Sequence, residues 1–156
     1  MSDVALRIEV NGSPHTVEVP THLMLVDLLR DRLGLMGTRL ACDQAVCGAC
    51  TVLVDGAPVA ACSTFAFQVD GRAVLTIEGL RGPDGRLDPV QQAFVERSAF
   101  QCGYCTSGMI LLTKALLAAH PRPDRATIVR WLGANVCRCT GYQMIVEAVE
   151  DAAGRG

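Results

Sequence analysis

The stretch GTRLACDQAVCGACTVLVDG at residues 37–56 decides how the first half of the chain folds. It contains three cysteines, Cys42, Cys47 and Cys50, and a fourth, Cys62, follows after eleven further residues. Four thiolates are the ligand set of one 2Fe–2S cluster or one structural zinc ion. The small residues between these cysteines let a loop wrap closely around a bound group and point backbone N–H groups at its sulfur atoms. The stretch therefore predicts a metal centre in a tight loop.

The remaining cysteines form a second set of four: Cys102, Cys105, Cys137 and Cys139. We interpret the two sets as two metal centres in a row, which would form a path for electrons. A disulfide framework is the alternative, but residues 1–24 lack the apolar core of a signal peptide. In a reducing cytosol, paired cysteines are more often metal ligands than disulfides.

The spacing of the first set, C-x4-C-x2-C, is that of plant-type ferredoxins and favours a 2Fe–2S cluster over zinc. A zinc knuckle pairs one CxxC with another and has no reason to use a gap of four. The second set has C-x2-C followed, after 31 residues, by C-x-C, and on spacing alone zinc stays open there. Helix starts predicted after Cys105 and Cys139 would stabilise an anionic centre of either kind.

Length and composition argue against several classes of function. The chain has 156 residues, enough for one ordinary domain or two small ones, and a formal net charge of -2. This charge and an aromatic content of 4% argue against nucleic acid as a partner, because binding it needs basic surfaces and stacking side chains. No apolar stretch approaches the length of a membrane span. We therefore expect a cytoplasmic protein with no membrane span.

The first half has the period-two alternation of strands. The predicted strands are residues 5–10, 15–19, 51–54, 58–61 and 74–78. Turn signals Asn11-Gly12 and Asp55-Gly56 join the first two and the next two as hairpins. Apolar residues at helical spacing over 24–33 predict one helix, which ends at Gly34. A small mixed sheet crossed by one helix fits this order.

The second half has the period of helices. The predicted helices are residues 89–98, 106–119, a short one after residue 124, and 140–152. Pro89 suits a first helical turn, and Asp124 suits an N-cap. The turn at 82–85 places a domain boundary near residue 80, giving domains 1–79 and 80–156. Each domain is small enough that a bound metal centre would contribute to its folding free energy.

The motifs QCGYCT at 101–106 and NVCRCTGY at 135–142 resemble the small iron–sulfur subunit of the bacterial molybdenum hydroxylases, the xanthine oxidase family. With residues 37–56, the resemblance covers essentially the whole chain. It implies an α+β fold: an N-terminal plant-type ferredoxin-like β-grasp domain followed by a C-terminal four-helix bundle domain. The family usually has glycine in place of Ala41 and Ala45, and proline in place of Ser107. Alanine at a glycine position matters only where φ is positive.

The resemblance implies an electron-transfer subunit of an oxidoreductase. In such enzymes a large subunit holds molybdopterin, here expected in its cytosine dinucleotide form, and oxidises the substrate. A medium subunit holds FAD, and the chains are expected to form a dimer of heterotrimers. The second set of cysteines would bind the 2Fe–2S cluster nearer molybdenum, and the first set would bind the cluster nearer FAD. No residue of this chain is expected to attack substrate.

Two residues of the second half are expected to contact the pterin. Gln101 matches the glutamine that hydrogen-bonds the pterin in this family. Its side-chain amide offers both a donor and an acceptor, as recognition of a pterin requires. A polar residue at a helix end is the plainer interpretation of Gln101. Cys139 would lie at the pterin edge, as both ligand and entry point for electrons. Arg138 could offset cluster charge, bind a partner's carboxylate, or be solvated. The scattered histidines are expected on the surface or in turns: His15, His22 and His120.

Two other functions use the same cysteines. A zinc-stabilised interaction module would have no redox role and would leave Gln101 unexplained. A free-standing ferredoxin would explain the first set and leave the helical half unexplained. Substrate selectivity in the family lies in the large chain, so this sequence does not specify a substrate.

Overall fold

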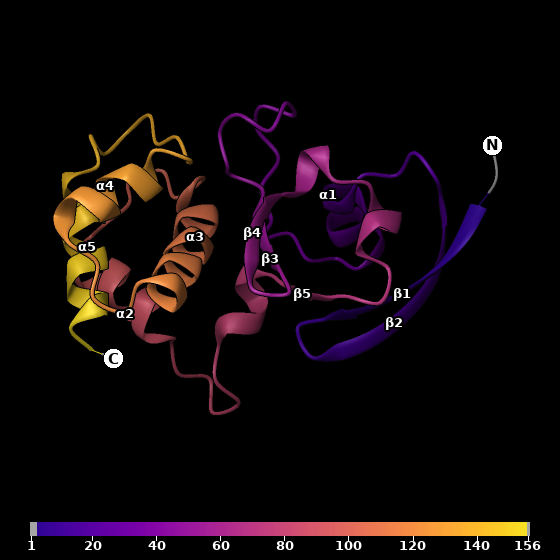
Figure 1. Cartoon of the computed structure of the whole chain (residues 1–156), viewed down its shortest axis with the longest axis horizontal. Coiled ribbons are helices and arrows are strands. Elements are labelled where there is room, and N and C mark those ends of the chain that lie inside the picture. The colour runs from indigo at the N-terminus through magenta and orange to yellow at the C-terminus, as the bar shows by residue number, and fades with distance from the viewer. Residues whose placement is uncertain (1–2, 156) are drawn as a thin grey trace.

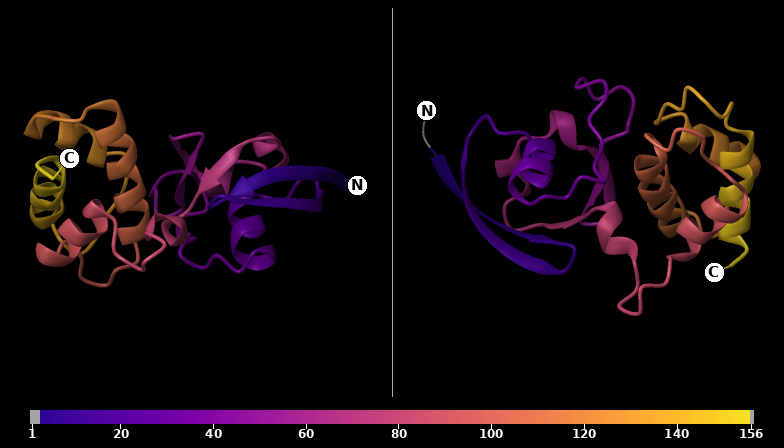
Figure 2. Two further views of the ribbon diagram at one scale, coloured as in Figure 1. Left: turned by 90° about the horizontal axis from the view of Figure 1, so that it is seen from below. Right: turned by 180° about the vertical axis from the view of Figure 1, so that it is seen from behind.

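The structure is a computed structural model that describes residues 3–155. The strands of the first half and the helices of the second half form two lobes side by side along the long axis (Figure 1). The first strand lies in one lobe and the C-terminus at the outer side of the other, and two further views show the same separation (Figure 2). The order of elements agrees with the predicted strand-rich and helix-rich halves.

The described residues contain one five-stranded sheet of order β2-β1-β5-β3-β4. Its strands are β1 (Asp3–Val10), β2 (Ser13–Pro20), β3 (Thr51–Val54), β4 (Ala57–Ala60) and β5 (Ala73–Leu75). β1 and β5 are parallel, and the other neighbours are antiparallel, so the sheet is mixed as predicted. The two predicted hairpins are β1–β2 and β3–β4.

The predicted strand at 74–78 is wrong in its second part. β5 ends at Leu75, and Ile77–Leu80 form a short 3-10 helix, η4. The fully buried Thr76 explains the break, because its N–H donates to the Asn11 side-chain oxygen at 2.8 Å and not to a neighbouring strand. The Glu78 carboxylate then accepts from the Thr76 hydroxyl and the Gly37 N–H. This network holds the turn that follows β5.

One helical segment packs on the sheet. α1 (Leu25–Asp27) continues directly into a π-helical turn, η1 (Leu28–Arg32), which confirms the helix predicted over 24–33. Leu28 is fully buried against the inward-facing residues of β1, whose strict alternation puts every second side chain in this core. Two 3-10 turns follow β4, η2 (Ala61–Ser63) and η3 (Ala66–Val69). Cys62 lies in the first of these.

The second half contains four further helices in the described residues. They are α2 (Pro89–Glu96), α3 (Thr106–Ala119), α4 (Arg125–Leu132) and α5 (Gln143–Ala153). α2 packs against α3 and α5, and α4 packs against the same two helices, so the four enclose one apolar core. Asp88 and Asp124 accept from backbone N–H groups in the first turns of α2 and α4, which confirms the predicted Asp124 cap.

The halves meet where α3 lies beside β3. Leu111 and Ala115 on α3 form a small buried cluster with Leu53 on β3. Trp131 of α4 packs against the same cluster from its partly buried position. The α3 face that carries these residues therefore sets how the helical lobe sits on the sheet (Figure 1). None of the helices in the described part of the chain is long and apolar enough to cross a membrane.

We expect Phe94→Ala to lower the free energy of unfolding by about 3–5 kcal/mol. Phe94 is 1% exposed in the core of the helical half, so truncation leaves a cavity there. Guanidinium-induced unfolding followed by far-UV circular dichroism measures the change. Val95→Ala is the matched control, because Val95 is 51% exposed and should change stability by less than about 0.5 kcal/mol. Equal effects of the two changes would contradict the described core.

Candidate iron–sulfur sites

The first set of cysteines lies in the loop between η1 and β3 and in the η2 turn. Backbone N–H groups of this loop point at the sulfur atoms. Those that donate to the Cys42 sulfur, each at 3.4 Å, belong to Gln44, Val46 and Cys47. The Cys62 N–H donates to the Cys50 sulfur at 3.4 Å. Such bonds stabilise negative charge on sulfur, as a bound iron–sulfur cluster requires.

Ala45 explains why this loop curls. Its φ is +55°, so the alanine occupies the left-handed region where the family usually has glycine. In this conformation the Ala45 N–H donates to the Cys62 sulfur at 3.3 Å. The strain costs about 1–2 kcal/mol relative to ordinary backbone. Ala41 has no positive φ, so the other glycine-to-alanine departure carries no such strain.

The thiols of the first set differ in acidity. Hydrogen bonds from the N–H groups of Cys47, Gln44 and Val46 lower the pKa of the Cys42 thiol to about 6. Burial raises the pKa of the Cys50 thiol to about 12. Cys50 therefore needs a positive charge beside it to become a ligand, and a coordinated metal ion supplies one.

The second set of cysteines lines one cavity of about 150 Å³ between the two halves. The cysteines that line this cavity are Cys102, Cys105, Cys137 and Cys139, together with Cys47 of the first set. Burial raises the pKa of the Cys105 thiol to about 12. Burial acts in the same sense on Cys137, but hydrogen bonds from Thr140 outweigh it and lower the pKa of that thiol. The Thr140 hydroxyl lies 3.2 Å from the Cys137 sulfur.

The thiols of each set act on one another. The Cys102 and Cys139 sulfur atoms are 3.6 Å apart. Hydrogen bonding to a neighbouring thiol contributes to the shifted pKa values of Cys42, Cys50 and Cys105, where the neighbours are Cys47, Cys62 and Cys137. Four thiolates grouped in this way are the ligand set that one 2Fe–2S cluster requires.

The start of α3 also fits an anionic group. Thr106 and Ser107 lie in the first turn of α3, directly after Cys105, and their hydroxyl oxygens are buried without a hydrogen-bond partner among the described residues. A buried hydroxyl without a partner costs about 1–3 kcal/mol. The sulfur atoms of a cluster would be acceptors at this helix N-terminus, where the helix dipole also favours negative charge.

The predicted helix start after Cys139 is wrong. α5 begins at Gln143, because Gly141 and Tyr142 have φ values of +67° and +70°, which an α-helix does not allow. The first turn of α5 therefore begins beyond the loop that carries Cys137 and Cys139. A helix N-terminus therefore lies directly after Cys105, whereas Cys139 is separated from the start of α5 by three residues.

Tyr142 has a role that sequence reasoning missed. Its hydroxyl accepts from the Cys137 N–H at 2.8 Å and donates to the Asn135 carbonyl at 3.0 Å, so it closes the loop between them. The other tyrosine, Tyr104, donates to the Leu40 carbonyl at 2.6 Å. The chain has two tyrosines and both lie inside the cysteine motifs, which is the signal that could have indicated their roles.

The predicted pterin-contacting residues lie at one exposed edge of the second set. Gln101, Cys102 and Cys139 are all exposed. Arg138 is exposed and lines the cavity of the second set. An incoming cofactor or protein can therefore reach this edge without any rearrangement of the core.

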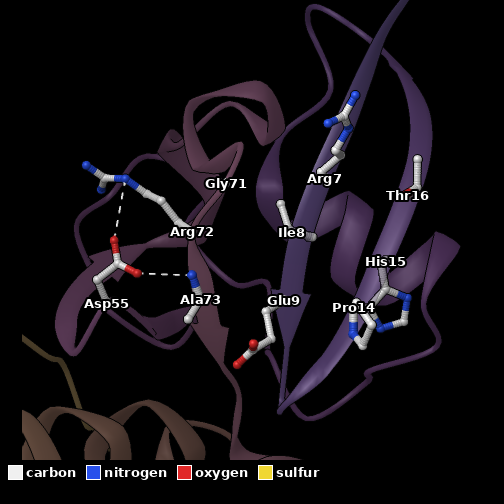
Figure 3. A pocket seen from close by; sticks show the side chains of 10 residues that line it. All are labelled: Arg7, Ile8, Glu9, Pro14, His15, Thr16, Asp55, Gly71, Arg72 and Ala73. Carbon is white, nitrogen blue, oxygen red and sulfur yellow. Dashed lines mark hydrogen bonds and ion pairs between the residues drawn. The ribbon is translucent and has the colours of Figure 1, made fainter.

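The histidines lie apart from the cysteine sets. The His120 ring packs edge-on against Trp131, with ring centroids 6.0 Å apart, and His22 is exposed. His15 lines a hollow on the sheet lobe, shown in Figure 3. The charged groups of this hollow neutralise one another in part, since Arg72 forms an ion pair with Asp55 at 3.6 Å. No cysteine lines this hollow.

Comparisons with known proteins agree with this geometry. Residues 8–74 match the family described as 2Fe-2S iron-sulfur cluster binding domain, and residues 76–150 match a second 2Fe-2S binding domain family. The nicotine 6-hydroxylase small subunit of Paenarthrobacter nicotinovorans is 48% identical, over 97% of this chain and 91% of that subunit. The nicotinate dehydrogenase small FeS subunit of Eubacterium barkeri is 41% identical, over 99% of this chain and 98% of that subunit. The chain belongs to the small iron–sulfur subunits of the molybdenum hydroxylases.

Solved structures of this family have the same fold. Quinoline 2-oxidoreductase from Pseudomonas putida 86 contains a chain that is 40% identical, with a TM-score of 0.91 over 99% of this chain and 98% of that one. Aldehyde oxidoreductase from Desulfovibrio gigas has a TM-score of 0.92 and 42% identity over 97% of this chain. The match covers 17% of that longer chain. The small iron–sulfur subunit therefore occurs both as a separate chain and as part of a longer one.

We expect Cys42 of the cluster-free subunit to react with iodoacetamide at half its maximal rate near pH 6. The thiolate is the nucleophile, so the rate rises as the pH rises through the pKa. Cys50 is the internal control, because its raised pKa keeps it protonated and unreactive at pH 7. Mass spectrometry of peptides after timed labelling measures both rates. Equal rates at pH 7, in a chain that circular dichroism shows to be folded, would contradict the described loop.

Proposed function

We propose that this chain carries two 2Fe–2S clusters and passes electrons from a molybdopterin centre on a large subunit towards FAD on a medium subunit. The observation that carries the proposal is the cavity lined by all four cysteines of the second set, which Cys47 of the first set also lines. A 2Fe–2S cluster accepts and releases one electron at a time. The function of this chain is to hold two such groups close together.

The ligands of the first cluster are Cys42, Cys47, Cys50 and Cys62. The ligands of the second are Cys102, Cys105, Cys137 and Cys139. The grouping of the second set around one cavity supports this assignment, since four thiolates ligate one 2Fe–2S cluster. The hydrogen bonds to the sulfur atoms of the first set support it further, because thiolates without such donors would be costly in a half-buried loop.

The exposed edge of the second cluster site faces the molybdopterin. Cys139 is both a ligand and the entry point for electrons, and the Gln101 amide hydrogen-bonds the pterin with its donor and acceptor groups. Exposure of both residues supports this role, because a buried edge could not meet a cofactor on another subunit. Arg138 lies on the same edge and binds an anionic group of the large subunit.

The assembly we propose is a dimer of heterotrimers in the cytoplasm, with the pterin in its cytosine dinucleotide form. Within this chain, residues 1–79 form the ferredoxin-like domain and residues 80–156 form a closed four-helix bundle. The separate apolar cores of the two halves support this division. The pairwise packing of α2, α3, α4 and α5 supports the bundle.

We expect the purified complex to contain about four iron ions per small subunit and to show two EPR signals after reduction. Cys139→Ala removes a ligand of the second cluster, so that signal disappears and turnover from substrate to acceptor stops. Cys62→Ala is the matched control and removes the other signal. Metal analysis and low-temperature EPR measure both changes. Two zinc ions in place of iron, or a Cys139 variant with both clusters and full activity, would contradict the assignment.

We expect Gln101→Ala to weaken association with the large subunit about 2- to 10-fold, the equivalent of one net hydrogen bond. Titration of the separated subunits gives the dissociation constant without knowledge of the substrate. Gln92→Ala is the control, because Gln92 lies on α2 and bonds within that helix to Glu96. If both variants bind equally well, Gln101 makes no contact in the complex.

A further inference from the structure

The two cysteine loops are joined by a backbone hydrogen bond. The Val136 N–H donates to the Cys47 carbonyl at 2.8 Å, and Val136 directly precedes Cys137 in the chain. This bond links a residue of the first set to the neighbour of a residue of the second. It is bent or broken by any shift of one loop against the other.

Asn135, the residue before this bond, is buried in the seam between the loops. It is 3% exposed, and its side-chain amide donates to the Gly48 carbonyl at 3.1 Å. Its side-chain oxygen lies 3.4 Å from the Thr51 hydroxyl, which donates at the shorter distance of 2.7 Å to the same Gly48 carbonyl. Both partners belong to the first half, next to Cys47 and Cys50. The amide therefore reaches from the second cysteine loop into the first.

The backbone of Asn135 is held from the other side. Its carbonyl accepts from the Tyr142 hydroxyl, which also accepts from the Cys137 N–H. The side chain and the main chain of Asn135 thus contact different cysteine loops. The side chain binds the loop of Cys47 and Cys50, and the main chain is fixed to the loop of Cys137.

The seam is closely packed. A Cβ atom on Gly48 would lie 1.8 Å from the Asn135 side-chain oxygen, so the side chain fills that space. A Cβ atom on Gly108, in the first turn of α3, would lie 2.2 Å from the Gly48 carbonyl oxygen. A side chain at Gly48 would therefore displace the Asn135 amide, and one at Gly108 would move the backbone of the first cysteine loop.

We propose that Asn135 is a positioning residue that fixes the separation and orientation of the two cluster sites. It acts through Gly48 and Thr51 on one side and through Val136 on the other, and it ligates nothing itself. This inference rests on the proposed function, because it presumes that both sets of cysteines bind clusters. Asn135 would affect the distance and orientation between the two clusters, and not the binding of either cluster alone.

Loss of the amide should loosen the seam. A buried hydrogen-bonding group left without its partner shifts an equilibrium about 5- to 150-fold. We therefore expect Asn135→Ala to raise the local opening constant of the seam by this factor. Exchange of the Val136 amide hydrogen reports the opening directly, since that hydrogen forms the bond to Cys47.

The experiment compares three variants in the assembled complex. Asn135→Ala removes the amide. Thr51→Val removes the hydroxyl beside the amide, together with its bond to the Gly48 carbonyl, and keeps the side-chain shape, which guards against simple failure to fold. Asn11→Gly is the matched control. The Asn11 amide also makes two side-chain hydrogen bonds, both to Thr76, but Asn11 lies at the β1–β2 turn. Its φ of +52° is one that glycine adopts without strain.

Two readouts are measured on each variant. Hydrogen exchange with mass spectrometry follows the peptide that contains Val136. Low-temperature EPR of the reduced complex follows the magnetic interaction between the two clusters, which depends on their distance and orientation. Iron content and the signal of each cluster are recorded separately.

We expect Asn135→Ala, and to a smaller degree Thr51→Val, to speed exchange at Val136 and to change the splitting between clusters while iron content stays at the wild-type level. Asn11→Gly should change neither. Unchanged splitting in a fully loaded Asn135→Ala variant would overturn the inference, as would equal changes in Asn11→Gly. A wild-type complex without iron clusters would overturn the proposed function instead, which keeps the two failures distinguishable.

Discussion

The hydrogen bond from the Val136 N–H to the Cys47 carbonyl is the contact on which the rest of the structure depends. Electrons pass between two clusters only if the clusters stay close, and here Cys47 and Val136 lie some 90 residues apart in the chain. The two halves therefore have to be held together at the cysteine loops themselves. Leu53, Leu111 and Ala115 bring α3 onto β3, and the polar seam then fixes the loops in detail.

The cysteine loops show how sequence chemistry and backbone geometry cooperate. Thiolates in a half-buried loop need hydrogen-bond donors, and side chains long enough to donate would not fit between them. The donors are backbone N–H groups of the loop itself. Left-handed conformations at Asp43 and Ala45 help to turn these N–H groups towards the sulfur atoms. In the second loop, the Thr140 hydroxyl donates to the Cys137 sulfur, and the Tyr142 hydroxyl holds the loop by accepting from the Cys137 N–H and donating to the Asn135 carbonyl.

Much of the fold and of the site could be predicted from local pattern. The β1–β2 hairpin follows from alternation on either side of Asn11-Gly12, and α3 follows from its apolar stripe between Cys105 and the prolines at 121 and 123. Errors fall where a distant contact overrides a local preference. The strand over 74–78 stops early because Asn11 captures Thr76, and the helix predicted from 140 begins at Gln143 because Gly141 and Tyr142 adopt left-handed backbone.

The sequence by itself indicated two sets of four cysteines, a strand-rich and a helix-rich half, and the family, because cysteine spacing and helical or strand period are local properties of the chain. Tertiary structure alone decided how the two sets face each other. In the sequence, Asn135 is one polar residue of a motif, and only the fold shows that its amide binds the Gly48 carbonyl. Gly108 likewise looks like an ordinary helical glycine, and only the fold shows that α3 approaches the Gly48 carbonyl there. The physical reason is that a buried amide and a close backbone approach are defined by partners far away in the chain, which no local pattern encodes.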